Sequence, residues 1–342
     1  MIVKFLGQDI VDYLIETPDE NIQMSLDIVT DQESIIKLNN DNSIWLGGST
    51  SILNGINWKG ERVHIYNDDY TILDGIVTGG SINGNVFELK VQGRLAMIFE
   101  KLVVYQNTDT NPAKALLAIL EGFGYDDYID YPSFYRSSNV YDNLNVSIGV
   151  YYYPDTGATF KAVCDELSAM GSAYMFMQDN KIHFQVYEAV SGTPLYSITE
   201  SDMLDYPKQT STGIQLVYND YSVDYFLSNL VPATDSGGSK YGQVTQGVYN
   251  EARVWARDFG KISRIQCNNI TTAHGLGGLR MLRDRWDKNR LSFNMRLDLY
   301  PLSVGQVYKI TSADHGWDEK NCRLFGIQKN EKKALCLFEE IK

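Results

Sequence analysis

The chain has 342 residues with a formal net charge of −13 and a pI near 4.8. This acidity argues against a protein that holds nucleic acid, sequence-specific or not, through phosphate contacts, because the surface repels phosphate. No run approaches the roughly 20 apolar residues of a membrane-spanning helix, and the first residues turn polar too early for a signal peptide, so we expect a soluble protein made in a cytoplasm, without membrane insertion.

Cysteines and histidines give no sign of a metal or cofactor. The four cysteines form no C-x-x-C motif, and three lie in apolar runs, which is typical of reduced core thiols; they are Cys164, Cys267, Cys322 and Cys336. The histidines are too far apart for a metal-ligand spacing; they are His64, His183, His274 and His315. We therefore expect no bound metal and no cofactor.

Residues 1–105 have the pattern of a small antiparallel β-barrel. Short alternating runs are separated by glycine or Asn/Asp clusters, with no long helix between them. The predicted strands are Met24–Val29, Arg62–Tyr66, Tyr70–Val77 and Val86–Val91. Asn83-Gly84 predicts a hairpin turn between the last two.

Residues 106–200 predict a middle α+β domain. A helix at 111–123 begins at Asn111-Pro112, and its buried stripe contains Ala113, Leu116, Leu117, Leu120 and Phe123. A second helix at 158–170 buries Phe160, Val163, Cys164, Leu167 and Met170 and ends at Gly171, which suits a left-handed C-cap. The Tyr-, Asp- and Asn-rich stretch between them, 125–145, reads as a loop region.

A hairpin follows the second helix directly. Its predicted strands are Ala173–Met177 and Lys181–Tyr187, and Asp179-Asn180 supplies the turn. A helix laid on a hairpin buries one apolar face of each without help from distant sequence. This helix-hairpin unit is the clearest local structure in the chain.

The remainder predicts a second β-barrel interrupted by an insertion. Residues 201–228 supply its first strands, at 214–218 and 221–225, and residues 291–342 supply the rest, at 291–299, 306–310, 322–327 and 334–338. The insertion, 229–290, has a mobile loop or a segment that orders on assembly at Val231–Gln246, a strand at Ile262–Ile270 and one helix with Thr271 or Thr272 as N-cap. The fold class expected is thus α+β, mainly β: two small barrels and a middle helix-hairpin domain.

No catalytic motif stands out, so we assign no catalytic, cofactor-binding or metal-binding residues. The most site-like peptide is Asp314–Asp318, whose two carboxylates and Trp317 suggest a glycosidase-like alternative, although a hairpin loop explains it more simply. Tyr151–Tyr153 similarly suggests an aromatic platform for stacking sugars or bases, but a short strand ended by Pro154 explains it more simply. A cell-wall hydrolase and a carbohydrate-binding module therefore remain as alternative functions.

The order of the predicted domains along the chain is similar to that of a known family. A β-domain containing Asp74–Val77 and Phe87–Leu95 is followed by a helix-hairpin domain, then by a helix that leads into Leu297–Thr311. The final motif places Gly305 before Val307-Tyr308-Lys309-Ile310-Thr311. This order resembles the baseplate-hub family of bacteriophage tails, which includes T4-type and Mu-like hub proteins. Members often have Asp after that glycine, where this chain has Gln306, so the subgroup stays open.

The resemblance implies a structural role in a virion tail, with synthesis and assembly in the bacterial cytoplasm. Family members look like two related barrels joined by α+β insertions, and three copies form a ring of six barrels. Such a homotrimer joins the tail tube or a distal tail protein to a spike, fibre or tape-measure protein, and lets DNA pass. An acidic wall suits that passage because it does not hold phosphates.

Overall fold

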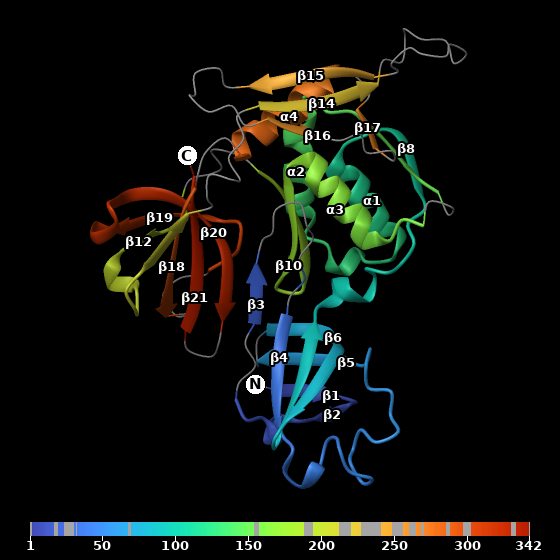
Figure 1. Cartoon of the computed structure of the whole chain (residues 1–342), viewed down its shortest axis with the longest axis vertical. Helices are drawn as coiled ribbons and strands as arrows, with labels where there is room; N and C mark the ends of the chain where they lie inside the picture. The colour runs from blue at the N-terminus through green and yellow to red at the C-terminus, as the bar shows by residue number, and fades with distance from the viewer. Residues whose placement is uncertain are drawn as a thin grey trace.

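The computed structural model describes residues 2–16, 20–23, 31, 33–67, 70–153, 157–187, 194–211, 220–226, 241–247, 256–259, 265–267, 270–284, 288–296, 302–329 and 333–341. Figure 1 shows two barrel-like β-domains, one from each end of the chain, beside a helical middle domain. The expected fold class, α+β and mainly β, is confirmed. Within the described residues, no helix has the length and apolar character needed to cross a bilayer.

The N-terminal β-domain is one antiparallel run of strands in the order β4-β7-β6-β5-β1-β2. The strands are β1 Ile2–Phe5, β2 Gln8–Asp9, β4 Glu33–Asn39, β5 Arg62–Asn67, β6 Tyr70–Asn83 and β7 Val86–Gln92. Alternate residues of β4 and β7 are buried, as a strand with one face on a core requires. The predicted strands are confirmed, except that Met24–Val29 lies outside the described residues. The hairpin turn is also confirmed, with Asn83 opposite Val86 and Gly84 at φ +57°.

The C-terminal β-domain follows the order β13-β18-β21-β20-β19-β12. Its strands are β12 Ser197–Ile198, β13 Lys208–Ser211, β18 Asn289–Arg296, β19 Val307–Ser312, β20 Trp317–Lys329 and β21 Lys333–Glu340. The four predicted C-terminal strands are confirmed in the parts that the structure describes. Strand β20 starts earlier than the predicted strand at 322–327, at Trp317.

A single short strand joins the two β-domains. Strand β3, Glu20–Gln23, pairs antiparallel with the second half of β20, from Gly326 to Lys329. On its other side β3 meets β4 at one residue pair, Asn21 and Glu33. The first half of β20 pairs instead with β19. One hydrogen-bonded sheet therefore runs from the C-terminal domain into the N-terminal domain.

The middle domain packs three helices against a hairpin and a small sheet. The helices are α1 Pro112–Gly122, α2 Tyr131–Asn143 and α3 Phe160–Gly171; the hairpin strands are β10 Ala173–Gln178 and β11 Lys181–Val186; the sheet, in the order β17-β9-β8, contains β8 Tyr105–Thr110, β9 Ile148–Tyr152 and β17 Ile265–Cys267. Helix α1 begins as predicted, since the Asn111 side chain accepts a hydrogen bond from the Lys114 amide at 3.0 Å.

Helix α2 corrects the prediction of a loop region at 125–145. Asp130 caps the helix by accepting a hydrogen bond from the Ser133 amide at 3.1 Å. Phe134 and Tyr141 are buried, but Ser137 and Ser138 share the buried side. A half-polar buried face gives too weak an apolar period to be recognised from sequence.

Serines of α2 complete the free edge of β11. The Ser133 hydroxyl accepts a hydrogen bond from the Phe184 amide at 3.2 Å. The Ser137 hydroxyl donates to the Phe184 carbonyl at 2.9 Å and accepts from the Val186 amide at 3.1 Å. The Asp130 amide donates to the Ile182 carbonyl at 2.9 Å. The helix thus takes the place of a third strand and satisfies backbone groups that would otherwise be buried and unpaired.

The hairpin is confirmed, and both faces of its first strand, β10, are buried. Asp179 and Asn180 form the turn, with φ +49° and +58°. All six residues of β10 are buried. Met175 and Met177 belong to the core of the middle domain, whereas Tyr174 and Phe176 belong to the core of the C-terminal β-domain. Figure 1 shows β10 between the helices and that domain.

The predicted C-cap at Gly171 is wrong by one residue. Gly171 is the last residue of α3, and Ser172 takes the left-handed conformation at φ +52°. Gly171 is required for a different reason: a Cβ there would collide with the Tyr141 hydroxyl, which donates a hydrogen bond to the Gly171 carbonyl at 2.7 Å. The glycine permits close approach of α2 to the end of α3.

Two further predictions need correction in the region before β18. Strand β14, Asp220–Phe226, pairs with β15, Tyr241–Gly247, and β16, Ala256–Phe259, rather than with the C-terminal β-domain. β13 occupies the predicted pairing position instead. The end of the expected mobile loop, Tyr241–Gln246, is strand, paired residue by residue with β14. The rest of that loop and the predicted strand at 214–218 lie outside the described residues.

Helix α4, Ile270–Asp284, begins before both candidate N-caps. Thr272 is buried and serves another purpose: its hydroxyl accepts a hydrogen bond from the Ser147 amide at 2.8 Å. Ile270, predicted to end a strand, belongs to the helix. The threonine therefore ties α4 to the segment before β9.

Three of the cysteines are free and buried, as expected: Cys164, Cys322 and Cys336. Burial raises the pKa of Cys164 and Cys322, and raises that of Cys336 to about 12. These thiols are therefore protonated at neutral pH and unreactive. The side chain of Cys267 lies outside the described residues.

A buried ion cluster closes the junction between the N-terminal and middle domains. The Asp74 carboxylate accepts a hydrogen bond from Arg94 Nε at 2.8 Å, is paired with Arg94 Nη2, and lies 3.3 Å from Arg62. The Arg94 guanidinium lies 4.1 Å from the ring centre of Tyr128, which belongs to the middle domain. Burial raises the pKa of Asp74, whereas His64 and Arg62 act in the opposite direction.

Leu167→Ala should lower the free energy of unfolding by about 2–5 kcal/mol, because Leu167 is fully buried in the core of the middle domain and its truncation leaves a cavity. Urea denaturation followed by circular dichroism measures the change. Leu102→Ala is the control, since Leu102 is 55% exposed and its truncation should cost less than about 0.5 kcal/mol. Equal costs for the two variants would contradict the packing described.

Asp74→Asn should cost about 3–5 kcal/mol, because it leaves the buried Arg94 guanidinium without its counter-charge. Urea denaturation followed by circular dichroism measures this loss in the free energy of unfolding. Glu319→Gln removes an exposed pair with Lys309 and should cost at most about 1 kcal/mol. A loss for Asp74→Asn no greater than that of the control would show that the cluster does not hold the junction.

Candidate functional site

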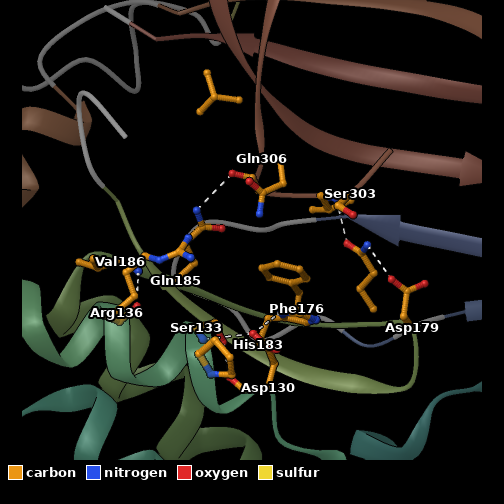
Figure 2. Close-up of a pocket in the computed structure, with 16 residues that line it drawn as sticks. Asp130, Ser133, Arg136, Phe176, Asp179, His183, Gln185, Val186, Ser303 and Gln306 are labelled. Atoms are coloured by element: carbon orange, nitrogen blue, oxygen red, sulfur yellow. Dashed lines mark hydrogen bonds and ion pairs between the residues drawn. The ribbon is translucent and has the colours of Figure 1, made fainter. Parts of the chain in front are cut away.

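A cavity of about 570 Å³ lies where the middle domain meets the C-terminal β-domain. Its walls come from the start of α2, the two hairpin strands and the turn at 303–307. Figure 2 shows Asp130, Ser133 and His183 on one side, with Ser303 and Gln306 opposite. Its volume falls in the range of roughly 300–1,000 Å³ that is usual for ligand sites.

Two glutamines of the hairpin hold the opposite wall in place. Gln178 Oε1 accepts a hydrogen bond from the Val304 amide at 2.8 Å, and Gln185 Nε2 donates to the Gly305 carbonyl at 3.2 Å. Gly305 has φ +85°, and a Cβ there would collide with Gln185 Oε1. Glycine is therefore required both for the backbone conformation and for this contact.

An Asp–His pair forms the floor of the cavity. His183 Nδ1 lies 3.2 Å from Asp130 Oδ2, and the imidazole stacks on Phe176 with ring centres 5.1 Å apart and an interplanar angle of 9°. The hydrogen bond with His183 lowers the pKa of Asp130, although burial opposes this effect. Asp130 is thus an ionised carboxylate at neutral pH, and it fixes the proton on Nδ1 of His183.

The site-like peptide Asp314–Asp318 lies away from this cavity. Trp317 is only 2% exposed and belongs to the core of the C-terminal β-domain, so its ring is not available to stack on a sugar. Asp314 and Asp318 are exposed, and His315 Nδ1 lies 3.0 Å from the Ser312 hydroxyl. The structure does not bring these residues into a pocket with the other candidates.

The three tyrosines at 151–153 do not form one platform. Tyr152 is fully buried, and its hydroxyl donates to Glu166 Oε2 at 2.8 Å, whereas Tyr153 is 43% exposed. Successive residues of a strand point to opposite faces, so the rings cannot align. The simpler prediction of a short strand is confirmed as far as Tyr152; Pro154 lies outside the described residues.

Of the four histidines, only His183 lines the cavity. His64 lies 3.4 Å from Asp74, His315 lies beside Ser312, and His274 is exposed on α4. Among the residues that the structure describes, no three His, Cys, Asp or Glu side chains gather as metal ligands.

Sequence reasoning missed most residues of the cavity. Asp130 and Arg136 lie in the stretch predicted as a loop, and Gln178 and Gln185 are ordinary polar residues of a hairpin. One signal was present: Asp130, Ser133 and Ser137 have the three- and four-residue spacing of one helix face. Nothing in the sequence places that face against the turn at 303–307.

No family model matches the chain, and no curated protein matches its sequence. Solved structures, by contrast, match the fold of this chain. The 43 kDa tail protein of prophage MuSo2 from Shewanella oneidensis is 10% identical, with a TM-score of 0.61 over 100% of this chain and 98% of that chain. This chain shares its fold with phage tail proteins.

Two further structures agree. The tail protein from Neisseria meningitidis MC58 is 8% identical, with a TM-score of 0.60 over 99% of this chain and 95% of that chain. Prophage tail protein gp18 from Listeria monocytogenes EGD-e is 9% identical, with a TM-score of 0.53 over 99% of this chain and 93% of that chain. The resemblance seen in the order of parts is thus confirmed as a shared fold that includes both β-domains and the middle domain.

Gly305→Ala should cost about 1–2 kcal/mol more than Gly316→Ala. Both glycines have positive φ, so both substitutions strain the backbone, but Gly316 has open space around it, whereas alanine at 305 also displaces Gln185. Urea denaturation of the two variants isolates that difference. Equal losses would mean that the Gln185 contact does not stabilise the interface.

Proposed function

We propose that the protein is a structural hub of a phage tail, located at the baseplate or tail tip and without catalysis of its own. The observation that carries the proposal is the pair of barrel-like β-domains at opposite ends of one chain, joined by β3 into one sheet. Three such chains supply six barrels, which match a sixfold tail tube on one side and a threefold spike or fibre on the other.

Exposed apolar side chains on both β-domains support self-assembly. Ile35 and Ile82 of the N-terminal domain are 48% and 44% exposed, and Leu204 and Tyr206 of the C-terminal domain are 52% and 66% exposed. A cyclic trimer brings unlike surfaces of neighbouring copies together, so each domain needs its own contact surface. The proposed contact is C-terminal domain to N-terminal domain of the next copy.

The excess of negative charge suits a ring around a DNA channel, since an acidic wall does not retain phosphates. The proposed partners are the tail tube or a distal tail protein, and a spike, fibre or tape-measure protein.

The structure gives less support to the two alternative functions, a cell-wall hydrolase and a carbohydrate-binding module. Trp317 and Tyr152 are buried, which weakens a carbohydrate-binding surface, and the exposed Asp314 and Asp318 do not line the cavity.

Light scattering across a concentration series should give a mass near three times 38.7 kDa, and negative-stain microscopy should show rings. A monomer at every concentration would contradict a self-assembling hub.

The double variant Leu204→Asp/Tyr206→Asp should shift the trimer toward monomer, because charges replace apolar contact area. The matched control is Leu102→Asp/Val104→Asp in the middle domain, where the side chains are 55% and 66% exposed. An unchanged mass for the first variant would remove Leu204 and Tyr206 from the interface; monomers from both would show a general effect of added charge.

A further inference from the structure

The cavity between α2 and the C-terminal β-domain has polar groups that its own walls do not use. Arg136 is exposed on α2, and its guanidinium has no hydrogen-bond or ion-pair partner among the described residues. Figure 2 shows it directed toward Gln185. On the opposite wall, the side-chain amide of Gln306 has no hydrogen bond to another described residue. Both residues line the cavity.

The carboxylates of the cavity are already engaged. Asp130 pairs with His183 and caps α2 through the Ser133 amide. Asp179 accepts a hydrogen bond from Gln178 Nε2 at 3.0 Å and lies at the far end from Arg136 in Figure 2. The free positive charge of the cavity is therefore at the Arg136 end, whereas Asp130 is engaged by hydrogen bonds from His183 and the Ser133 amide, and Asp179 lies at the far end.

The unused groups define a ligand class. A guanidinium recognises a carboxylate through two parallel hydrogen bonds. A side-chain amide both donates and accepts, which matches the C=O and N–H groups of a peptide backbone. The side-chain amide of Gln306 is available both as donor and as acceptor, and Gln185 Oε1 is available as a further acceptor in the same cavity.

We propose that this cavity binds an acidic peptide segment of a partner protein, with a Glu or Asp carboxylate on Arg136 and backbone amides on Gln306 and Gln185. The site goes beyond the proposed hub function, because a single chain contains all of it and ring assembly is not required. Since the walls come from two domains, a bound segment also bridges the middle domain and the C-terminal β-domain.

The test uses the full chain and fluorescein-labelled hexaglutamate, with binding followed by fluorescence anisotropy. Saturable binding is expected, and Arg136→Gln should weaken it by about tenfold or more, the usual effect of losing a charge-assisted hydrogen-bond pair. Lys59→Gln removes the same charge from an exposed site on the N-terminal β-domain and should leave the affinity unchanged. Since Arg136 is exposed and unpaired among the described residues, its variant should retain the wild-type urea midpoint, which separates lost binding from misfolding.

Labelled hexaglutamine and hexalysine test whether binding depends on the negative charge of the peptide. Weaker binding of both peptides than of hexaglutamate supports an acidic ligand. Absence of saturable hexaglutamate binding, equal loss in the Arg136 and Lys59 variants, or equal affinity for hexaglutamine would each overturn the proposal. The outcome is independent of the hub function, because the mass of the protein in solution is measured separately and a binding monomer supports the site as well as a binding trimer.

Discussion

The β10–β11 hairpin is the contact on which the arrangement of the domains depends. Strand β10 buries Met175 and Met177 among the helices and Tyr174 and Phe176 in the C-terminal β-domain. A strand with both faces covered gains apolar burial from two cores at once. Because both cores include residues of β10, we expect the middle domain and the C-terminal β-domain to behave as one cooperative structure, rather than as separate units on a linker.

The same constraint explains the cavity. Because α2 satisfies the edge of β11 with Ser133 and Ser137, the helix must lie close beside the hairpin and cannot also fill the space toward the turn at 303–307. Gln178 and Gln185 span that space at its ends. The cavity is therefore a result of how an edge strand is closed by a helix, and two of its polar lining residues, Ser133 and Ser137, are the side chains that this closure requires.

The sequence was informative wherever structure is local. The helix-hairpin unit, the Asn111 cap and the strands around Gly84 follow from periodicity, capping and turn chemistry within a few residues. It was uninformative where backbone pairing decides the outcome. Strand β3 joins two domains through main-chain hydrogen bonds to β20, more than 300 residues away, and such bonds require no particular side chains. Helix α2 was missed because serines occupy its buried face, and β14 was assigned to the wrong sheet because its partners lie in an insertion.

We expect the hairpin to make the middle domain and the C-terminal β-domain unfold as one unit. Native-state hydrogen exchange tests it most directly, with amides of β10, α3 and β21 followed in increasing urea. Amides of all three elements should exchange through a common opening, with the same free energy and the same urea dependence. Exchange of β10 and α3 through an opening that leaves β21 protected would contradict it, since the hairpin would then belong to the middle domain alone.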